Sequence, residues 1–162
     1  NKGQANYAAS KAGLSGMTYG IDAIEQFQPA LVVLAGFMRI LTDGFVQHFS
    51  GRLVNIHPSL LPKFKGLNTH ARAIEAGETE HGCTVHFVSP ELDGGAIIGH
   101  ARVAIASNDT AETLAAKVQQ LEHRLYPACV KLFCAGQVKL ADNGALLNGQ
   151  LLPLNGLDLT ET

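Results

Sequence analysis

Three polar residues of this chain have the types and the spacing of an acid–base site. Asn55 and His57 stand two residues apart at the end of a predicted strand, so their side chains leave it on the same face. Asp93 follows in a turn whose glycines permit tight backbone paths. An asparagine amide can stabilise an oxyanion, a histidine can move a proton, and an aspartate can orient the imidazole and favour its charged form. The set suits acyl transfer to an amine without a covalent intermediate, although a structural histidine at the strand end is the alternative.

The elements that carry Asn55 and His57 alternate as strand, helix and strand. Residues 30–36 and 53–57 form two apolar runs, which are typical of parallel strands covered on both faces. The intervening residues 42–50 have apolar positions at helical spacing. This order predicts a crossover in a parallel sheet, where ligands bind at the carboxyl ends of the strands.

The rest of the chain predicts a hairpin, a long helix and a tail of short strands. Residues 83–88 and 97–105 alternate in polarity and predict antiparallel strands on either side of Asp93. A long helix is predicted to begin with Asp109 as the N-cap of a capping box. We therefore expect an α/β fold with a mixed parallel and antiparallel sheet, helices on both faces, and a single domain over residues 1–162.

Composition narrows the class of protein further. The chain has 162 residues, of which 46% are hydrophobic and 16% charged, as in a globular protein. Its net charge of −2 predicts no nucleic-acid or membrane partner. Three cysteines predict no disulfide framework and a reducing, cytoplasmic setting. Cys83 and His86 point to opposite faces of a predicted strand, so we expect no metal site.

Longer motifs around the three polar residues resemble one enzyme family. Asn-x-His-Pro-Ser-Leu-Leu-Pro-Lys at 55–63 and Glu-Leu-Asp-Gly-Gly at 91–95 are similar to the signature of folate-dependent formyltransferases. With Leu-Ala-Gly-Phe-Met-Arg-Ile-Leu at 34–41, the pattern most resembles the glycinamide ribonucleotide formyltransferases, over residues 24–156. The resemblance implies a truncated Rossmann-like formyltransferase sheet.

The resemblance also implies an activity and a set of site residues. The family transfers the formyl group of 10-formyltetrahydrofolate to the amine of glycinamide ribonucleotide, in purine biosynthesis. Asn55, His57 and Asp93 match its catalytic set. Gln119 and Glu122 match helix positions near the ribonucleotide, with a solvated helix face as the alternative. The positions that match the folate pocket are Phe37, Met38, Arg39, Leu41, Val88 and Glu91.

The first residues resemble a different family. Residues 1–18 are similar to the active-site helix of short-chain dehydrogenases, with Tyr7 and Lys11 as its Tyr-x-x-x-Lys pair. A helix kept for packing is the alternative. The Gly-rich phosphate loop that precedes the matching part of the formyltransferases is not recognised here. We therefore predict a chimera, which is either a formyltransferase or an inactive protein that at most binds folate.

The apolar strands carry a prediction about assembly. Residues 31–34 and 53–56 are predicted to be buried on both faces, and residues 1–28 are the segment available to cover them. An apolar strand edge left open pairs with another chain or aggregates. We therefore predict a homodimer, with a possible exchange of the N-terminal helix between the two copies.

Overall fold

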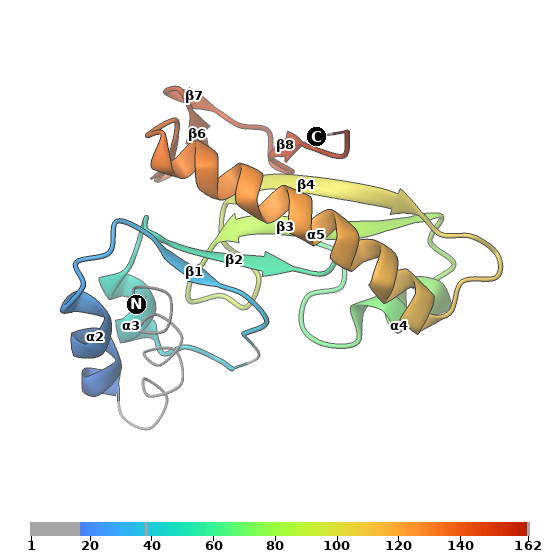
Figure 1. Ribbon diagram of the computed structural model, residues 1–162, viewed down its shortest axis with the longest axis horizontal. Helices are drawn as coiled ribbons and strands as arrows, with labels where there is room; N and C mark the ends of the chain where they lie inside the picture. The colour runs from blue at the N-terminus through green and yellow to red at the C-terminus, as the bar shows by residue number, and fades with distance from the viewer. Residues whose placement is uncertain (1–16, 38, 162) are drawn as a thin grey trace.

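The protein folds around a five-stranded mixed sheet (Figure 1). The structure is a computed structural model, and it describes residues 17–37 and 39–161. The strand order is β1-β2-β3-β4-β8. Parallel pairs at the two edges flank antiparallel pairs in the centre. The strands are β1 (Val32–Leu34), β2 (Leu53–His57), β3 (Glu80–Phe87), β4 (Ile97–Ala104) and β8 (Leu157–Asp158).

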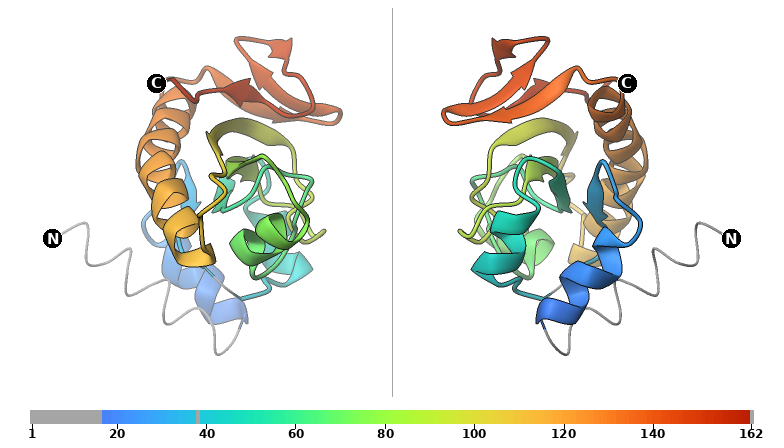
Figure 2. Two further views of the ribbon diagram at one scale, coloured as in Figure 1. Left: turned by 90° about the vertical axis from the view of Figure 1, so that its right-hand side faces the viewer. Right: turned by 90° about the vertical axis from the view of Figure 1, so that its left-hand side faces the viewer.

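Helices cover this sheet from both faces, as the sequence predicted. The long helix α5 (Ala111–Cys134) lies along one face, where it packs on Val54 and on alternate residues of β3 (Figures 1 and 2). Leu53 points to the opposite face, because successive strand residues alternate. There it packs with the buried residues of α3 (Asp43–His48), together with α2 (Met17–Glu25). The short helix α4 (Thr69–Glu75) contacts α5.

A second, three-stranded antiparallel sheet follows α5. It consists of β5 (Val138–Ala141), β6 (Gly144–Leu147) and β7 (Gln150–Leu151), and it lies beside the carboxyl-terminal end of α5 (Figure 1). Asn148 and Gly149 form its second turn, with φ values of 51° and 82°. These are left-handed conformations that asparagine and glycine adopt readily. The predicted tail of short strands is therefore confirmed.

The N-cap of α5 differs from the prediction. Thr110 occupies the position expected for Asp109, and its side-chain oxygen accepts a hydrogen bond from the Thr113 backbone N–H at 3.3 Å. The Thr113 hydroxyl accepts from the Thr110 backbone N–H at 2.9 Å, which completes the capping box. The Asp109 carboxylate instead accepts hydrogen bonds from the Ala106 N–H and from Lys117. The aspartate therefore closes the preceding turn, and the helix begins one residue later.

The strand β1 also departs from the prediction. It has three residues rather than a long run, and Val33 is 44% exposed instead of buried on both faces. The reason is its position, because β1 is an edge strand of the sheet and pairs only with β2 among the described residues. The backbone groups of an edge strand can pair with a strand of another chain, and an exposed apolar side chain favours such a contact. The homodimer itself stays a prediction.

Candidate functional site

The centre of the candidate site is a buried pair of His57 and Asp93. His57 is the last residue of β2, and Asp93 lies in the loop between β3 and β4. The Nδ1 atom of His57 lies 3.4 Å from Oδ2 of Asp93, and these side chains are only 7% and 9% exposed. The same carboxylate oxygen accepts a hydrogen bond from the Gly66 N–H at 2.9 Å. The Gly66 N–H therefore fixes the carboxylate oxygen that lies next to the imidazole.

The second ring nitrogen of His57 is also engaged. Its Nε2 donates to the backbone carbonyl of Phe64 at 2.9 Å. A neutral imidazole has one N–H and one lone pair, whereas both nitrogens of an imidazolium are donors. Since His57 lies between two oxygen acceptors, a neutral ring can donate to only one of them at a time. The bond to the Phe64 carbonyl therefore places the N–H of a neutral ring on Nε2.

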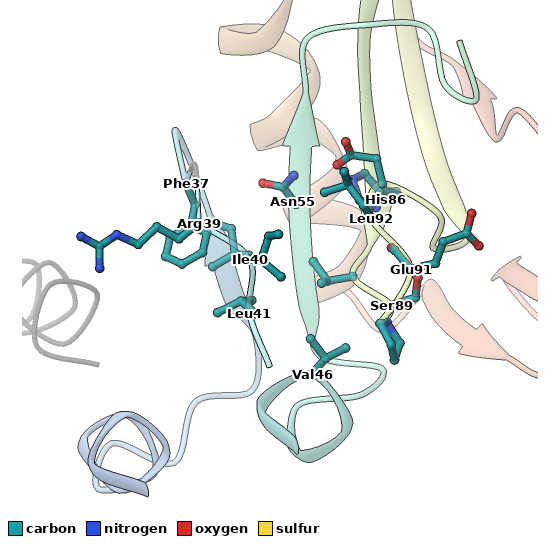
Figure 3. A pocket seen from close by; sticks show the side chains of 14 residues that line it. Phe37, Arg39, Ile40, Leu41, Val46, Asn55, His86, Ser89, Glu91 and Leu92 are labelled. Carbon is teal, nitrogen blue, oxygen red and sulfur yellow. Dashed lines mark hydrogen bonds and ion pairs between the residues drawn. The ribbon is translucent and has the colours of Figure 1, made fainter. Parts of the chain in front are cut away.

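Asn55 shares the face of His57 but stands closer to an open pocket. It pairs with His86 of β3 in the antiparallel ladder, so these two side chains project from the same face of the sheet. Figure 3 shows Asn55 between two walls, one formed by the segment after β1 and the other by residues 89–92. No residue in the described part of the chain forms a hydrogen bond with the Asn55 side chain. Its amide is therefore free to bind a group in the pocket.

The pocket gathers most of the residues predicted to hold folate. Asn55 and Asp93 line it together with Leu92, whereas His57 is not among the lining residues. The Arg39 guanidinium points away from Asn55 in Figure 3, and its predicted part in folate binding stays a prediction. Met38 lies outside the described residues. The predicted residues found in the lining are Phe37, Arg39, Leu41, Val88 and Glu91.

The turn that carries Asp93 depends on the residues around it. Asp93 has a φ of 47°, in the left-handed region that costs an aspartate less than most residues. A Cβ atom added to Gly95 would lie 1.8 Å from the Phe87 carbonyl oxygen, so no larger residue fits there. Lys65 and Glu91 add an ion pair of 2.7 Å between this turn and the loop after β2. The loop, the turn and the end of β2 therefore form one connected structure.

Replacement of Gly95 by alanine should distort this turn. We expect Gly95→Ala to lower the free energy of unfolding by about 1–3 kcal/mol, because the added methyl group overlaps a backbone oxygen that cannot move away. Chemical denaturation measures the difference. Gly44→Ala is the matched control, since nothing lies within 4 Å of the Cβ position at Gly44 in α3. Equal stability of the two variants would contradict the assigned close approach.

Gln119 and Glu122 are not brought to this pocket. Both lie on α5, and neither belongs to the pocket lining. Gln119 is exposed, and Glu122 is half-buried, where burial raises the pKa of its carboxyl. A role of these two residues in binding a ribonucleotide stays a prediction.

Sequence reasoning missed several residues of the pocket. Val46 lines it although it was assigned only to secondary structure, and Leu34 and Ile40 line it although they were quoted in the family motif without being counted as site residues. His86 was considered only as a metal ligand, yet it lies across from Asn55 and its Nε2 is 3.9 Å from Asp93 Oδ1. Its alternation with the apolar residues of β3 was the signal that could have placed it on the face of Asn55.

Among residues 17–37 and 39–161, no group of three or more histidine, cysteine, aspartate or glutamate side chains is placed to hold a metal ion. Over the same residues, no helix is long and apolar enough to cross a membrane.

Comparison with known proteins identifies the class to which this fold and pocket belong. The family model described as "Formyl transferase" matches residues 6–130, which is most of the chain. The chain therefore belongs to the formyl transferase family.

Individual relatives are more specific. A phosphoribosylglycinamide formyltransferase of Escherichia coli is 51% identical over 136 residues, which cover 84% of this chain and 64% of that protein. The solved phosphoribosylglycinamide formyltransferase of Coxiella burnetii is 46% identical, with a TM-score of 0.84 over 91% of this chain and 71% of that chain. A formyltetrahydrofolate deformylase of Pseudomonas syringae is 27% identical, with a TM-score of 0.73 over 78% and 43% of the two chains. This chain spans 64% of the length of the E. coli relative.

The comparisons do not support the predicted chimera. The formyl transferase match begins at residue 6, so it includes Tyr7 and Lys11, which were assigned to a short-chain dehydrogenase. The four-residue spacing of a tyrosine and a lysine is too short a pattern to identify a family. The helix predicted around these two residues lies outside the described part of the chain.

Proposed function

We propose that this chain transfers a formyl group from 10-formyltetrahydrofolate to the amine of glycinamide ribonucleotide, a step of purine biosynthesis. The observation that carries the proposal is the buried His57–Asp93 pair beside Asn55, at the edge of the pocket between β1 and the Asp93 turn. The relatives support the choice of reaction, since two that are 51% and 50% identical over the matched residues are phosphoribosylglycinamide formyltransferases.

Each of the three residues has a separate role in this proposal. The substrate amine attacks the formyl carbon, and the Asn55 amide donates a hydrogen bond to the oxyanion that forms. His57 takes the proton that the amine loses and passes it to the folate nitrogen, as the bond between that nitrogen and the formyl carbon breaks. Asp93 keeps the imidazole oriented and stabilises its charged form.

The hydrogen bond between His57 and Phe64 has a consequence for this mechanism. Nε2 is bound to the Phe64 carbonyl, and Nδ1 faces Asp93. One of these contacts has to break before the ring can accept a proton. The Asp93 carboxylate is also held by the Gly66 N–H, so its contact with His57 is the one that should persist. The contact with the Phe64 carbonyl, in the loop after β2, is the one that should break. We therefore assign the proton transfer to Nε2, which has to leave the Phe64 carbonyl and present its lone pair while the ring N–H is on Nδ1, facing Asp93.

The pocket supplies the binding surface for the folate in this proposal. Its walls combine apolar side chains such as Phe37, Leu41 and Val88 with polar groups near Asn55. This composition suits a flat ring system with a few polar atoms. We assign the folate ring to this pocket, and the ribonucleotide to the side of Asn55 and His57 on which its amine can reach the formyl group.

A reduced-folate analogue should stabilise the folded chain. A ligand that binds only the folded state adds about 2.7 kcal/mol at a concentration of 100 times its Kd. We expect a higher thermal midpoint in calorimetry or fluorescence, together with formylation of glycinamide ribonucleotide that requires 10-formyltetrahydrofolate. Absence of both effects would contradict the proposal.

Two matched variants locate the bound analogue. Leu92 is 56% exposed and lines the pocket, so Leu92→Asp should leave folding intact and abolish the stabilisation. Leu154 is exposed and lies outside the pocket lining, so Leu154→Asp should keep the stabilisation. Equal shifts in the two variants would place the analogue elsewhere.

A further inference from the structure

His86 is a buried histidine in the wall of the candidate pocket. It lies opposite Asn55 in the β2–β3 ladder, and its side chain is only 3% exposed. Its Nδ1 donates to the Phe87 carbonyl oxygen at 2.9 Å, because a carbonyl can only accept. This bond fixes the ring and directs Nε2 toward Asp93.

The Nε2 atom of His86 has no hydrogen-bond partner. Within residues 17–37 and 39–161, it is the one buried side-chain nitrogen or oxygen in that condition. Its nearest charged neighbour is Oδ1 of Asp93 at 3.9 Å. Burial lowers the pKa of His86, so the ring is neutral and presents a lone pair at Nε2. Buried polar atoms are almost always paired, and an exception at a site calls for an explanation.

The Asp93 carboxyl therefore stands between two histidines. Its Oδ2 faces His57 and accepts from the Gly66 N–H, while its Oδ1 faces His86. A lone pair and a carboxylate oxygen repel each other at short range unless a proton lies between them. A rotation of the Asp93 carboxyl that brings an unprotonated Oδ1 closer to Nε2 of His86 is therefore unfavourable. A hydrogen bond between these two atoms forms only when one of them carries a proton.

We propose that His86 is a positioning residue, which holds the Asp93 carboxyl so that Oδ2 stays directed at His57. The expected effect on turnover rests on the proposed function. The contact between His86 and Asp93 does not depend on it, because both residues belong to this chain. His86 also lines the pocket assigned to the folate ring, and the proposed effect on turnover passes through Asp93.

The chain contains a matched control in His100. It lies on β4 opposite Thr84, it is also buried, and its Nδ1 donates to the Asn155 carbonyl at 2.8 Å. Its Nε2 lies 3.9 Å from a carboxylate as well, that of Asp158. The two histidines share burial, anchoring and a carboxylate neighbour, but only His86 lies beside the candidate site.

The test compares His86→Leu, His86→Gln and His100→Leu in the whole chain, by steady-state kinetics and thermal unfolding. We expect His86→Leu to lower kcat about tenfold or more, because small misplacements of a catalytic group are costly, with little change in KM. His86→Gln should recover part of kcat, since its side chain fills the space beside Asp93 and its amide oxygen can present lone pairs to Oδ1 as Nε2 does. His100→Leu should change the thermal midpoint without lowering kcat.

A double-mutant cycle separates positioning from general destabilisation. If His86 acts through Asp93, His86→Leu has no further effect on kcat in the Asp93→Asn background. The imidazole ¹⁵N signals of His57 supply a readout that needs no turnover, and they should shift in His86→Leu but not in His100→Leu. A wild-type chain without formyl transfer would refute the proposed function alone. Unchanged His57 signals, or equal kcat in His86→Leu and wild type, would overturn the role of His86.

Discussion

Replacement of His57 by alanine is expected to lower kcat for formyl transfer by about 10²–10⁴-fold, the usual contribution of a general acid–base group. The reason is that no other described residue combines a titratable ring with the contact to Asp93 at 3.4 Å and a place at the end of β2. Asp93→Asn should follow it closely, because the amide still accepts from the Gly66 N–H but no longer stabilises a charged imidazole.

The matched control for this prediction is a histidine outside the site. His48 of α3 is 40% exposed, pairs with Glu25 and is not among the residues that line the pocket. His48→Ala should therefore keep the rate of the wild type. Both site variants should remain folded in thermal unfolding. Turnover at the wild-type rate in His57→Ala would remove the proposed mechanism, whatever the folate analogue does.

The elements that sequence reasoning placed correctly are those whose signal is local. β2 has the bounds that were predicted, Leu53–His57, because an apolar run ends directly at Pro58. The helix α3 lies within the predicted residues 42–50, and its apolar positions Phe45 and Val46 are buried as their spacing indicated. In each case the side-chain pattern and the turn residues point to the same structure, so no distant contact is needed to decide it.

The elements that it misplaced depend on contacts distant in sequence. The exposure of Val33 follows from the place of β1 at the sheet edge, which no local pattern records. β8 has two residues, and it exists only because it pairs with Gly99 and His100 of β4. Asp109 is not the N-cap, because its carboxylate accepts a hydrogen bond from the Ala106 N–H. The Thr110 hydroxyl caps the helix instead, by accepting from the Thr113 N–H.

The candidate site divides in the same way. Alternation along β2 placed Asn55 and His57 on one face, and the hairpin brought the Asp93 turn beside them. The bond from His57 to the Phe64 carbonyl could not be predicted, because it depends on the path of the loop after Pro58. The position of His86 opposite Asn55 depends on the register between β2 and β3, which the sequence alone does not show.

Replacement of Asn55 is expected to have the second large effect on kcat, because its amide faces the oxyanion that forms only during the reaction. Its side chain lies between the two walls of the pocket (Figure 3), and no described residue binds its amide. A preorganised amide donor costs no reorganisation when an oxyanion forms beside it, and in a site that excludes water its contribution is large. The ground-state carbonyl gains less from the same donor, so the loss on mutation should appear in kcat.

We expect Asn55→Ala to lower kcat by about 10²–10³-fold, the range found when one oxyanion donor is removed. Asn55→Asp should be slower still, because it replaces the donor by a negative charge beside the developing oxyanion. Single-turnover kinetics at saturating substrates measure the chemical step directly. Asn108→Ala is the control, since Asn108 is an exposed asparagine outside the pocket lining and should keep the wild-type rate. If Asn55→Asp were as fast as Asn55→Ala, the amide would not face the oxyanion, and its role would be confined to holding the substrate in the pocket.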